Sequence, residues 1–136
     1  IYRLWPDRAA PIADAIDGED LGALTTLLAE ELPQPPDAAM LAWVGRRSRR
    51  LLGGAVSRGF RELMLDAPVT DRHALAAVDV PVLVIGAEGD PVHPAQVARE
   101  LAEALPLGRL LVFPPGGLLW AHRAALREEI SGFLSG

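Results

Sequence analysis

The chain has 136 residues, half of them apolar, with a formal net charge of −5 and no cysteine. This size and composition suit one ordinary domain with a real core, while the acidic balance argues against a general nucleic-acid binder. The lack of cysteine excludes disulfides and thiolate chemistry, and no apolar run approaches the roughly 18 residues of a membrane span.

Composition also bears on the source of the chain. Alanine, leucine, arginine and proline dominate and lysine is absent, a bias typical of a high-GC bacterium. Because no charged and then apolar leader or membrane span is found, we expect a cytoplasmic protein. The chain begins with Ile1 and not with methionine, so we expect it to be a piece of a longer protein.

The first half of the chain predicts short helices separated by Pro and Gly. Large apolar groups near the start, at Tyr2, Leu4 and Trp5, are too few to bury one another. Apolar residues at helical spacing predict helices over residues 21–32 and 37–51, the second capped by Asp37. Two further helices are predicted over residues 56–64 and 72–77.

The second half contains two short apolar runs that predict buried strands. Residues 82–85 are bounded by Pro81 and Gly86, as in a central parallel strand. Asp90 follows where this strand ends, which is where open α/β sheets place their ligands and chemistry. A helix is predicted from Pro94 to residue 105, with Val97, Leu101 and Leu105 as its core face.

The second strand is predicted over residues 109–113, followed by a Gly-rich loop and a terminal helix. Strand, helix and strand give one right-handed βαβ unit. The predicted fold class is therefore α/β, with helices in residues 1–78 and a βαβα unit with two parallel strands in residues 79–136.

The stretch from Val80 to Asp90 reads Val-Pro-Val-Leu-Val-Ile-Gly-Ala-Glu-Gly-Asp and resembles the acid-bearing segment of the α/β-hydrolase superfamily. The resemblance reaches from about Asp79 to the C-terminus. It implies that residues 1–78 are a helical cap and residues 79–136 the last part of the core. It also implies that the N-terminal half of the fold is supplied by the same protein, a separate chain or a second copy, because two strands alone are marginal in water.

In this family a serine on a Gly-x-Ser-x-Gly elbow attacks a carbonyl, a histidine takes its proton and an acid orients the histidine. The resemblance gives Asp90 the position of the acid; an Asp that caps the following turn is the alternative. The usual histidine position is Leu118, which cannot move a proton, so His122 is a candidate for a shifted role or else a packed residue. Ser57 follows no predicted strand and is expected to be an ordinary helix residue, with the elbow upstream of Ile1.

The other histidines carry weaker expectations. His93 is interpreted as a loop or capping residue and His73 as an exposed residue of the cap. Because the three histidines fall on separate elements, no metal site is predicted, and Gly116-Gly117 lacks the context of a nucleotide-binding loop. No cofactor is therefore predicted. Four arginines between residues 46 and 50 suit a solvated face, or else a cap that favours an acidic substrate or partner.

The predicted function is hydrolysis of an ester, amide or similar carbonyl compound of small size. This chain would supply the cap and the acid-bearing loop but not the nucleophile, with no nucleic acid or membrane as partner. Leu118 favours an alternative, a non-catalytic relative that binds a small molecule between cap and sheet. A helical interaction module is the third hypothesis, and an upstream serine elbow would favour the enzyme over both.

Overall fold

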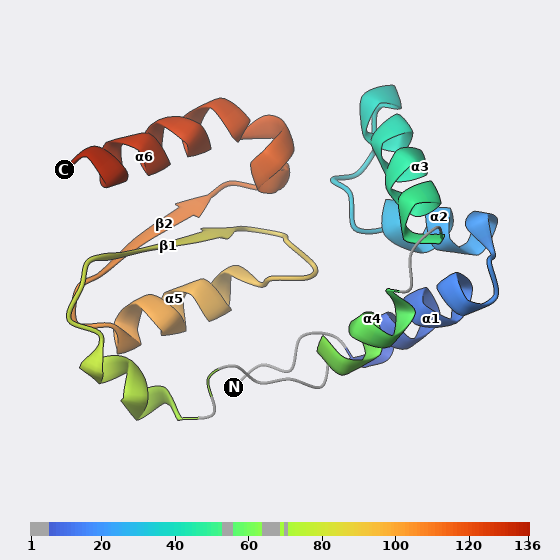
Figure 1. Ribbon diagram of the computed structural model, residues 1–136. Coiled ribbons are helices and arrows are strands. Elements are labelled where there is room, and N and C mark those ends of the chain that lie inside the picture. The colour runs from blue at the N-terminus through green and yellow to red at the C-terminus, as the bar shows by residue number, and fades with distance from the viewer. Residues whose placement is uncertain (1–5, 53–55, 64–68, 70) are drawn as a thin grey trace. The chain divides into compact units, whose positions relative to one another are not determined.

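The computed structural model describes residues 6–52, 56–63, 69 and 71–136, and the chain divides into two compact units (Figure 1). One unit lies within residues 3–67, and its described elements are all helices. The other begins at residue 68 and contains both strands. The short helix at residues 72–77 therefore groups with the strands, whereas the sequence placed it with the preceding helices.

Helix α1 (Pro6–Asp17) occupies a stretch to which the sequence analysis assigned no element. Pro11 lies inside this helix. A proline in a helix interior removes one backbone hydrogen bond. Ile12, Ala13 and Ile16 are nevertheless buried, and their packing outweighs the lost bond. The apolar groups predicted at Tyr2, Leu4 and Trp5 lie outside the described residues.

The next three helices confirm the predicted ones. They are α2 (Leu21–Ala29), α3 (Ala38–Leu52) and α4 (Ser57–Leu63). Asp20 caps α2 by accepting the Ala23 N–H at 2.9 Å, and Asp37 caps α3 by accepting the Met40 N–H at 2.8 Å. The largest fully buried side chains of this unit are Ile12, Leu24, Leu28, Val44 and Ser48. None of the helices in the described residues is long and apolar enough to cross a membrane.

The second unit confirms the predicted α/β arrangement. It runs through η1 (Arg72–Ala77), β1 (Val82–Ala87), α5 (Ala95–Ala104), β2 (Gly108–Phe113), η2 (Gly117–Ala121) and α6 (Arg123–Ser135). The strands pair in parallel, from Val82 opposite Gly108 to Ala87 opposite Phe113. Helices α5 and α6 lie on opposite sides of this sheet (Figure 1).

The buried face of α5 differs in part from the predicted one, because Leu105 at its end is buried as expected and Val97 is half-buried, but Leu101 is not buried. Leu101 is 36% exposed, whereas Ala95 and Ala98 are buried. The helix lies so close to β1 that a Cβ on Gly86 would stand only 2.8 Å from the Ala98 Cβ. At this point of close approach only small side chains fit between helix and strand, and Ala95 and Ala98 occupy it.

A close contact at the start of β2 yields a stability prediction. A Cβ on Gly108 would lie 2.6 Å from the carbonyl oxygen of Ala102, so Gly108→Ala is expected to destabilise the protein by about 1–3 kcal/mol. Gly132 in α6 is the matched control, because a Cβ there meets no atom within 4 Å. Gly132→Ala should stabilise by roughly 0.5–1 kcal/mol through helix propensity. Urea denaturation of the whole protein measures both, and equal midpoints would contradict the close packing.

Candidate functional site

The loop after β1 holds the candidate acid. The chain leaves the strand at Ala87, turns at Gly89 with a φ of 71°, and reaches Asp90. The Asp90 Oδ1 atom accepts the backbone N–H groups of Val92 at 2.7 Å and His93 at 2.8 Å. The side chain is only 27% exposed. Two donors therefore fix the orientation of this carboxylate and leave its Oδ2 atom for another group.

His93 is the histidine that the structure brings to this carboxylate. Its Nδ1 atom lies 3.7 Å from the Asp90 Oδ2 atom, within ion-pair range, and its side chain is 68% exposed. The sequence analysis interpreted His93 as a loop or capping residue. The three-residue spacing between Asp90 and His93 could have predicted this pair. An Asp side chain that accepts the backbone N–H of the third residue after it holds that residue in a turn close to its own carboxylate.

His122 does not lie within one regular helix. One continuous terminal helix was expected, but a π-helical turn, η2, ends at Ala121 and α6 begins at Arg123. Gly116, with a φ of 130°, and Gly117, with a φ of 77°, open this turn. His122 therefore stands at a junction and not on a regular helix face.

The His122 ring has two partners. It stacks on Phe113 with 5.2 Å between ring centroids, and its Nε2 atom lies 3.3 Å from the carbonyl oxygen of Pro115. A Cβ on Gly89 would stand 3.8 Å from the Pro115 side chain, so the acid-bearing loop lies near the loop before His122. Within the described residues, however, neither hydrogen bond nor ion pair joins His122 to Asp90.

Leu118 and His73 complete the set of predicted positions. Leu118, in the usual place of the family histidine, is half-buried within η2. His73 is exposed in η1, and its backbone N–H donates to Asp71 Oδ1 at 2.9 Å. Among the described residues, no group of three His, Asp or Glu side chains is arranged to hold a metal ion.

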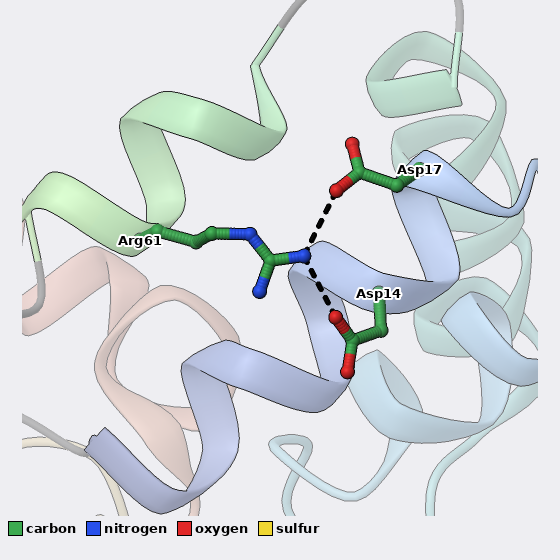
Figure 2. Close-up of polar contacts among 3 residues, drawn as sticks. All are labelled: Asp14, Asp17 and Arg61. Atoms are coloured by element: carbon green, nitrogen blue, oxygen red, sulfur yellow. Dashed lines mark hydrogen bonds and ion pairs between the residues drawn. The ribbon is translucent and has the colours of Figure 1, made fainter.

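Ser57 is the first residue of α4 and its side chain hydrogen-bonds to Asp17 of α1. Asp17 belongs to a polar cluster with Asp14 and Arg61, between α1 and α4 (Figure 2). Arg61 Nη2 donates to Asp14 Oδ1 at 2.7 Å and to Asp17 Oδ2 at 2.8 Å. A hydrogen bond from the Ser57 side chain, followed by that from Arg61, lowers the pKa of Asp17 below its usual value. Asp17 and then Asp14 raise the pKa of Arg61. In this setting Ser57 supports a contact between helices.

This cluster yields a prediction of pH dependence. The pKa of Asp17 is lower in the folded protein than in the unfolded chain. The ionised Asp17 carboxylate therefore stabilises the fold above the usual aspartate pKa, and this stabilisation is lost as pH falls through the lowered pKa. Arg61→Gln should therefore destabilise the whole protein at pH 7, with a difference that shrinks on acidification and in high salt. Arg58→Gln is the matched control, since the ion pair that Arg58 makes within the described residues is with Glu62 of its own helix. Urea denaturation at several pH values tests this, and a pH-independent difference would refute it.

A groove of about 630 Å³ lies along α2 and the segment that follows it, beside Thr25, Thr26 and Gln34. Glu30 is the one ionisable residue of its lining. None of the candidate acid or base residues therefore lines this groove.

Comparison with known proteins gives one family and several structural relatives. Residues 64–135, just over half of the chain, match the family described as TAP-like protein. A Mycobacterium tuberculosis protein named as a non-heme bromoperoxidase, BpoC, is 48% identical over 54 residues, which are 39% of this chain and 21% of that protein.

The solved structures extend the likeness to nearly the whole chain. The crystal structure of BpoC from M. tuberculosis H37Rv matches with a TM-score of 0.70 at 24% identity, over 98% of this chain and 54% of that one. The esterase RhEst1 from Rhodococcus sp. ECU1013 matches with a TM-score of 0.66 at 19% identity, over 93% of this chain and 46% of that one. The chain thus spans about half the length of these relatives.

Proposed function

Because this chain belongs to the TAP-like family of the α/β-hydrolase superfamily, we propose that it is the C-terminal part of an enzyme that hydrolyses an ester, amide or similar carbonyl compound. The observation that supports this most is the position of Asp90. It follows the carboxyl end of β1, inside the matched region, with its carboxylate held by two backbone N–H groups. A carboxylate fixed in this way is suited to orient an imidazole.

The catalytic groups and the cap are proposed to come from the two halves of the fold. The N-terminal half of the fold supplies the nucleophilic serine on its elbow, and this chain supplies the acid, Asp90. His122, in the loop region after β2, is the base that the sequence offers in place of Leu118. The helices before residue 68 form the cap over a small-molecule substrate, in keeping with the all-helical unit observed there.

We further propose that the whole protein is a cytoplasmic protein of a bacterium. Its bacterial origin is supported by the lysine-free, arginine-rich composition and by relatives from Mycobacterium and Rhodococcus. The N-terminal half is proposed to be an upstream segment of the same protein, with a separate chain or a second copy as alternatives. The chain's span of about half of its structural relatives supports the need for such a partner.

Leu118 favours a second candidate function. An apolar side chain at the usual histidine position would leave a serine without its base, and such an assembly could still bind a small molecule. The two functions differ in their turnover and not in their fold. A non-catalytic relative would bind carbonyl compounds and release them unchanged.

The test is turnover of p-nitrophenyl acetate and butyrate by the whole protein. The hydrolase proposal predicts saturable release of p-nitrophenol, unaffected by Ser57→Ala, because Ser57 supports the contact between α4 and α1. Stabilisation of the protein against heat by these esters or the corresponding amides, without any turnover, would favour the binding function and reject the enzyme.

A further inference from the structure

We propose that the helical unit, residues 3–67, binds a second copy of itself. The arginine-rich face of α3 in one copy (Trp43, Arg46, Arg47 and Arg50) contacts the acidic turn between α1 and α2 in the other (residues 17–20). The contact is reciprocal, and it is independent of the hydrolase proposal. Three observations carry it, namely the separation of charge along this part of the chain, the pairing of its arginines and the form of the two surfaces.

Charge is separated along the first 61 residues. Residues 1–37 hold eight Asp and Glu residues against two arginines, whereas residues 38–61 hold six arginines and no acidic residue. The two surpluses are equal and opposite, so this stretch is neutral although the whole chain carries −5. Two copies of an acidic chain repel one another over most of their surfaces. The helical unit is where opposite charges of two copies can meet.

The arginine-rich face lies on the solvent side of α3. Its members are three, four and seven residues apart, which places them along one side of the helix. Val44 and Ser48 are fully buried on the other side. The Arg47 Cζ atom lies 5.2 Å from the Trp43 ring centroid, so the guanidinium is held over an apolar ring. Trp and Arg are enriched among the residues that dominate binding between proteins.

The arginines of this face have no carboxylate partner within the described residues. The other two arginines of the stretch are paired, Arg58 with Glu62 and Arg61 with Asp14 and Asp17. Arginines that stand three or four residues apart on a helix repel one another. The helix dipole offsets this repulsion only in part, near the C-terminal end of α3. Acidic groups from outside the copy would offset the rest.

The acidic turn is held rigidly by its own copy. The backbone N–H groups of Gly18, Glu19 and Asp20 donate to carbonyl oxygens of α1 at 2.9, 3.1 and 2.9 Å. Glu19 is exposed, and among the described residues neither a hydrogen bond nor an ion pair engages its carboxylate. A turn that is already ordered loses little conformational entropy when it binds. Glu19 is therefore placed to meet the arginines of another copy.

The form of the arginine-rich face suits a protein partner. The outer side of a helix is convex, and the groove beside α2 is lined by none of the residues of this face. Small molecules bind mainly in concave sites. A helix that lies on a membrane inserts its apolar side, but Val44 of α3 is buried within the unit. The acidic turn of a second copy is a complementary surface that the chain itself provides.

The first test measures self-association of the whole protein by sedimentation at low and high salt. The unchanged protein is expected to form pairs that dissociate as salt screens the contact. Arg46→Glu combined with Arg50→Glu should raise the dissociation constant about tenfold or more, because acid then faces acid. Arg123→Glu combined with Arg127→Glu, on α6, is the control with the same change in net charge. A protein that stays monomeric at low salt, or equal association of both double variants, would overturn the inference.

The second test exchanges charges between copies. Glu19→Arg should by itself weaken pairing, because its arginine faces those of α3. Mixed with the variant that carries Arg46→Glu and Arg50→Glu, it should pair again. In the mixed pair one contact is unchanged, and the other has the charges on both of its sides reversed. Energy transfer between differently labelled variants measures this pairing, with circular dichroism to show that each is folded. A mixture that stays unpaired would show that the two surfaces do not meet.

Other occupants of the arginine-rich face give different results. Polyglutamate stands for a foreign acidic protein, and vesicles of phosphatidylglycerol and phosphatidylcholine stand for a membrane. A monomeric protein that binds either probe through Arg46 and Arg50 rejects the second copy as the partner. Ester turnover does not decide the inference, since a monomeric hydrolase would reject the pairing and leave the hydrolase proposal standing.

Discussion

Asp90→Asn is expected to lower ester turnover by the whole protein about 10³–10⁴-fold without unfolding it. The asparagine Oδ1 atom can still accept the N–H groups of Val92 and His93, so the loop keeps its form. The amide nitrogen, however, replaces the oxygen that would accept from an imidazole and stabilise its positive charge. The histidine is then left unoriented at the moment it must take a proton.

The measurement is kcat/KM for a p-nitrophenyl ester, with circular dichroism to show that the fold is intact. Asp71→Asn is the control, since Asp71 makes the same kind of turn contact at η1. A folded Asp90→Asn variant with turnover within a few-fold of the unchanged protein would show that Asp90 only caps the turn after β1.

Residues 1–136 expressed alone are expected to lack a stable fold around the two strands. Val80 is 56% exposed and Leu110 40%, and Leu119 beyond them is 67% exposed. At roughly 25 cal/mol per Å² of apolar surface, apolar side chains left in water at the strands and on η2 forgo several kcal/mol, comparable to the whole stability of a small domain. In the whole protein, further strands would cover these groups.

Hydrogen exchange and sedimentation compare the isolated segment with the whole protein. The segment should associate or exchange its strand amides quickly, and the same amides should be strongly protected in the whole protein. A monodisperse monomer of the segment with protected amides from Val82 to Ile85 would show that these residues make a complete unit by themselves.

The βαβ unit was predictable from sequence because its signals are local and strong. The apolar runs of β1 and β2 are short, unbroken and bounded by Pro and Gly, and a strand between covered faces needs no other pattern. The cap at Asp37 was predictable for the same reason, since a cap depends on contacts only three residues apart in the chain.

Features that depend on packing between elements were not predictable. No element was predicted where α1 lies, because the burial of Ile12 and Ile16 depends on packing against other elements. The core face of α5 was predicted correctly at Leu105 but not at Leu101. Where the helix approaches Gly86 closely, Ala95 and Ala98 are buried in place of a larger side chain.

In the candidate site, too, the local features were predictable and the features that depend on packing were not. Asp90 could be found because it follows a recognisable strand. The π-helical turn η2 interrupts the predicted terminal helix just before His122, and nothing in the apolar pattern signals that interruption. The proximity of His93 to Asp90 arises from a turn held by one side-chain oxygen, a contact that hydrophobic periodicity does not report.

Labelling of the whole protein with a fluorophosphonate, followed by peptide mass spectrometry, tests the central claim most directly. A fluorophosphonate reacts with a serine that a histidine and an acid have activated. If this chain is the acid-bearing part of a hydrolase, one serine upstream of Ile1 should be labelled stoichiometrically, Ser57 should not be labelled, and Asp90→Asn should slow the labelling strongly. No labelling at all, labelling of Ser57, or an upstream serine that reacts equally fast without the Asp90 carboxylate would contradict the account.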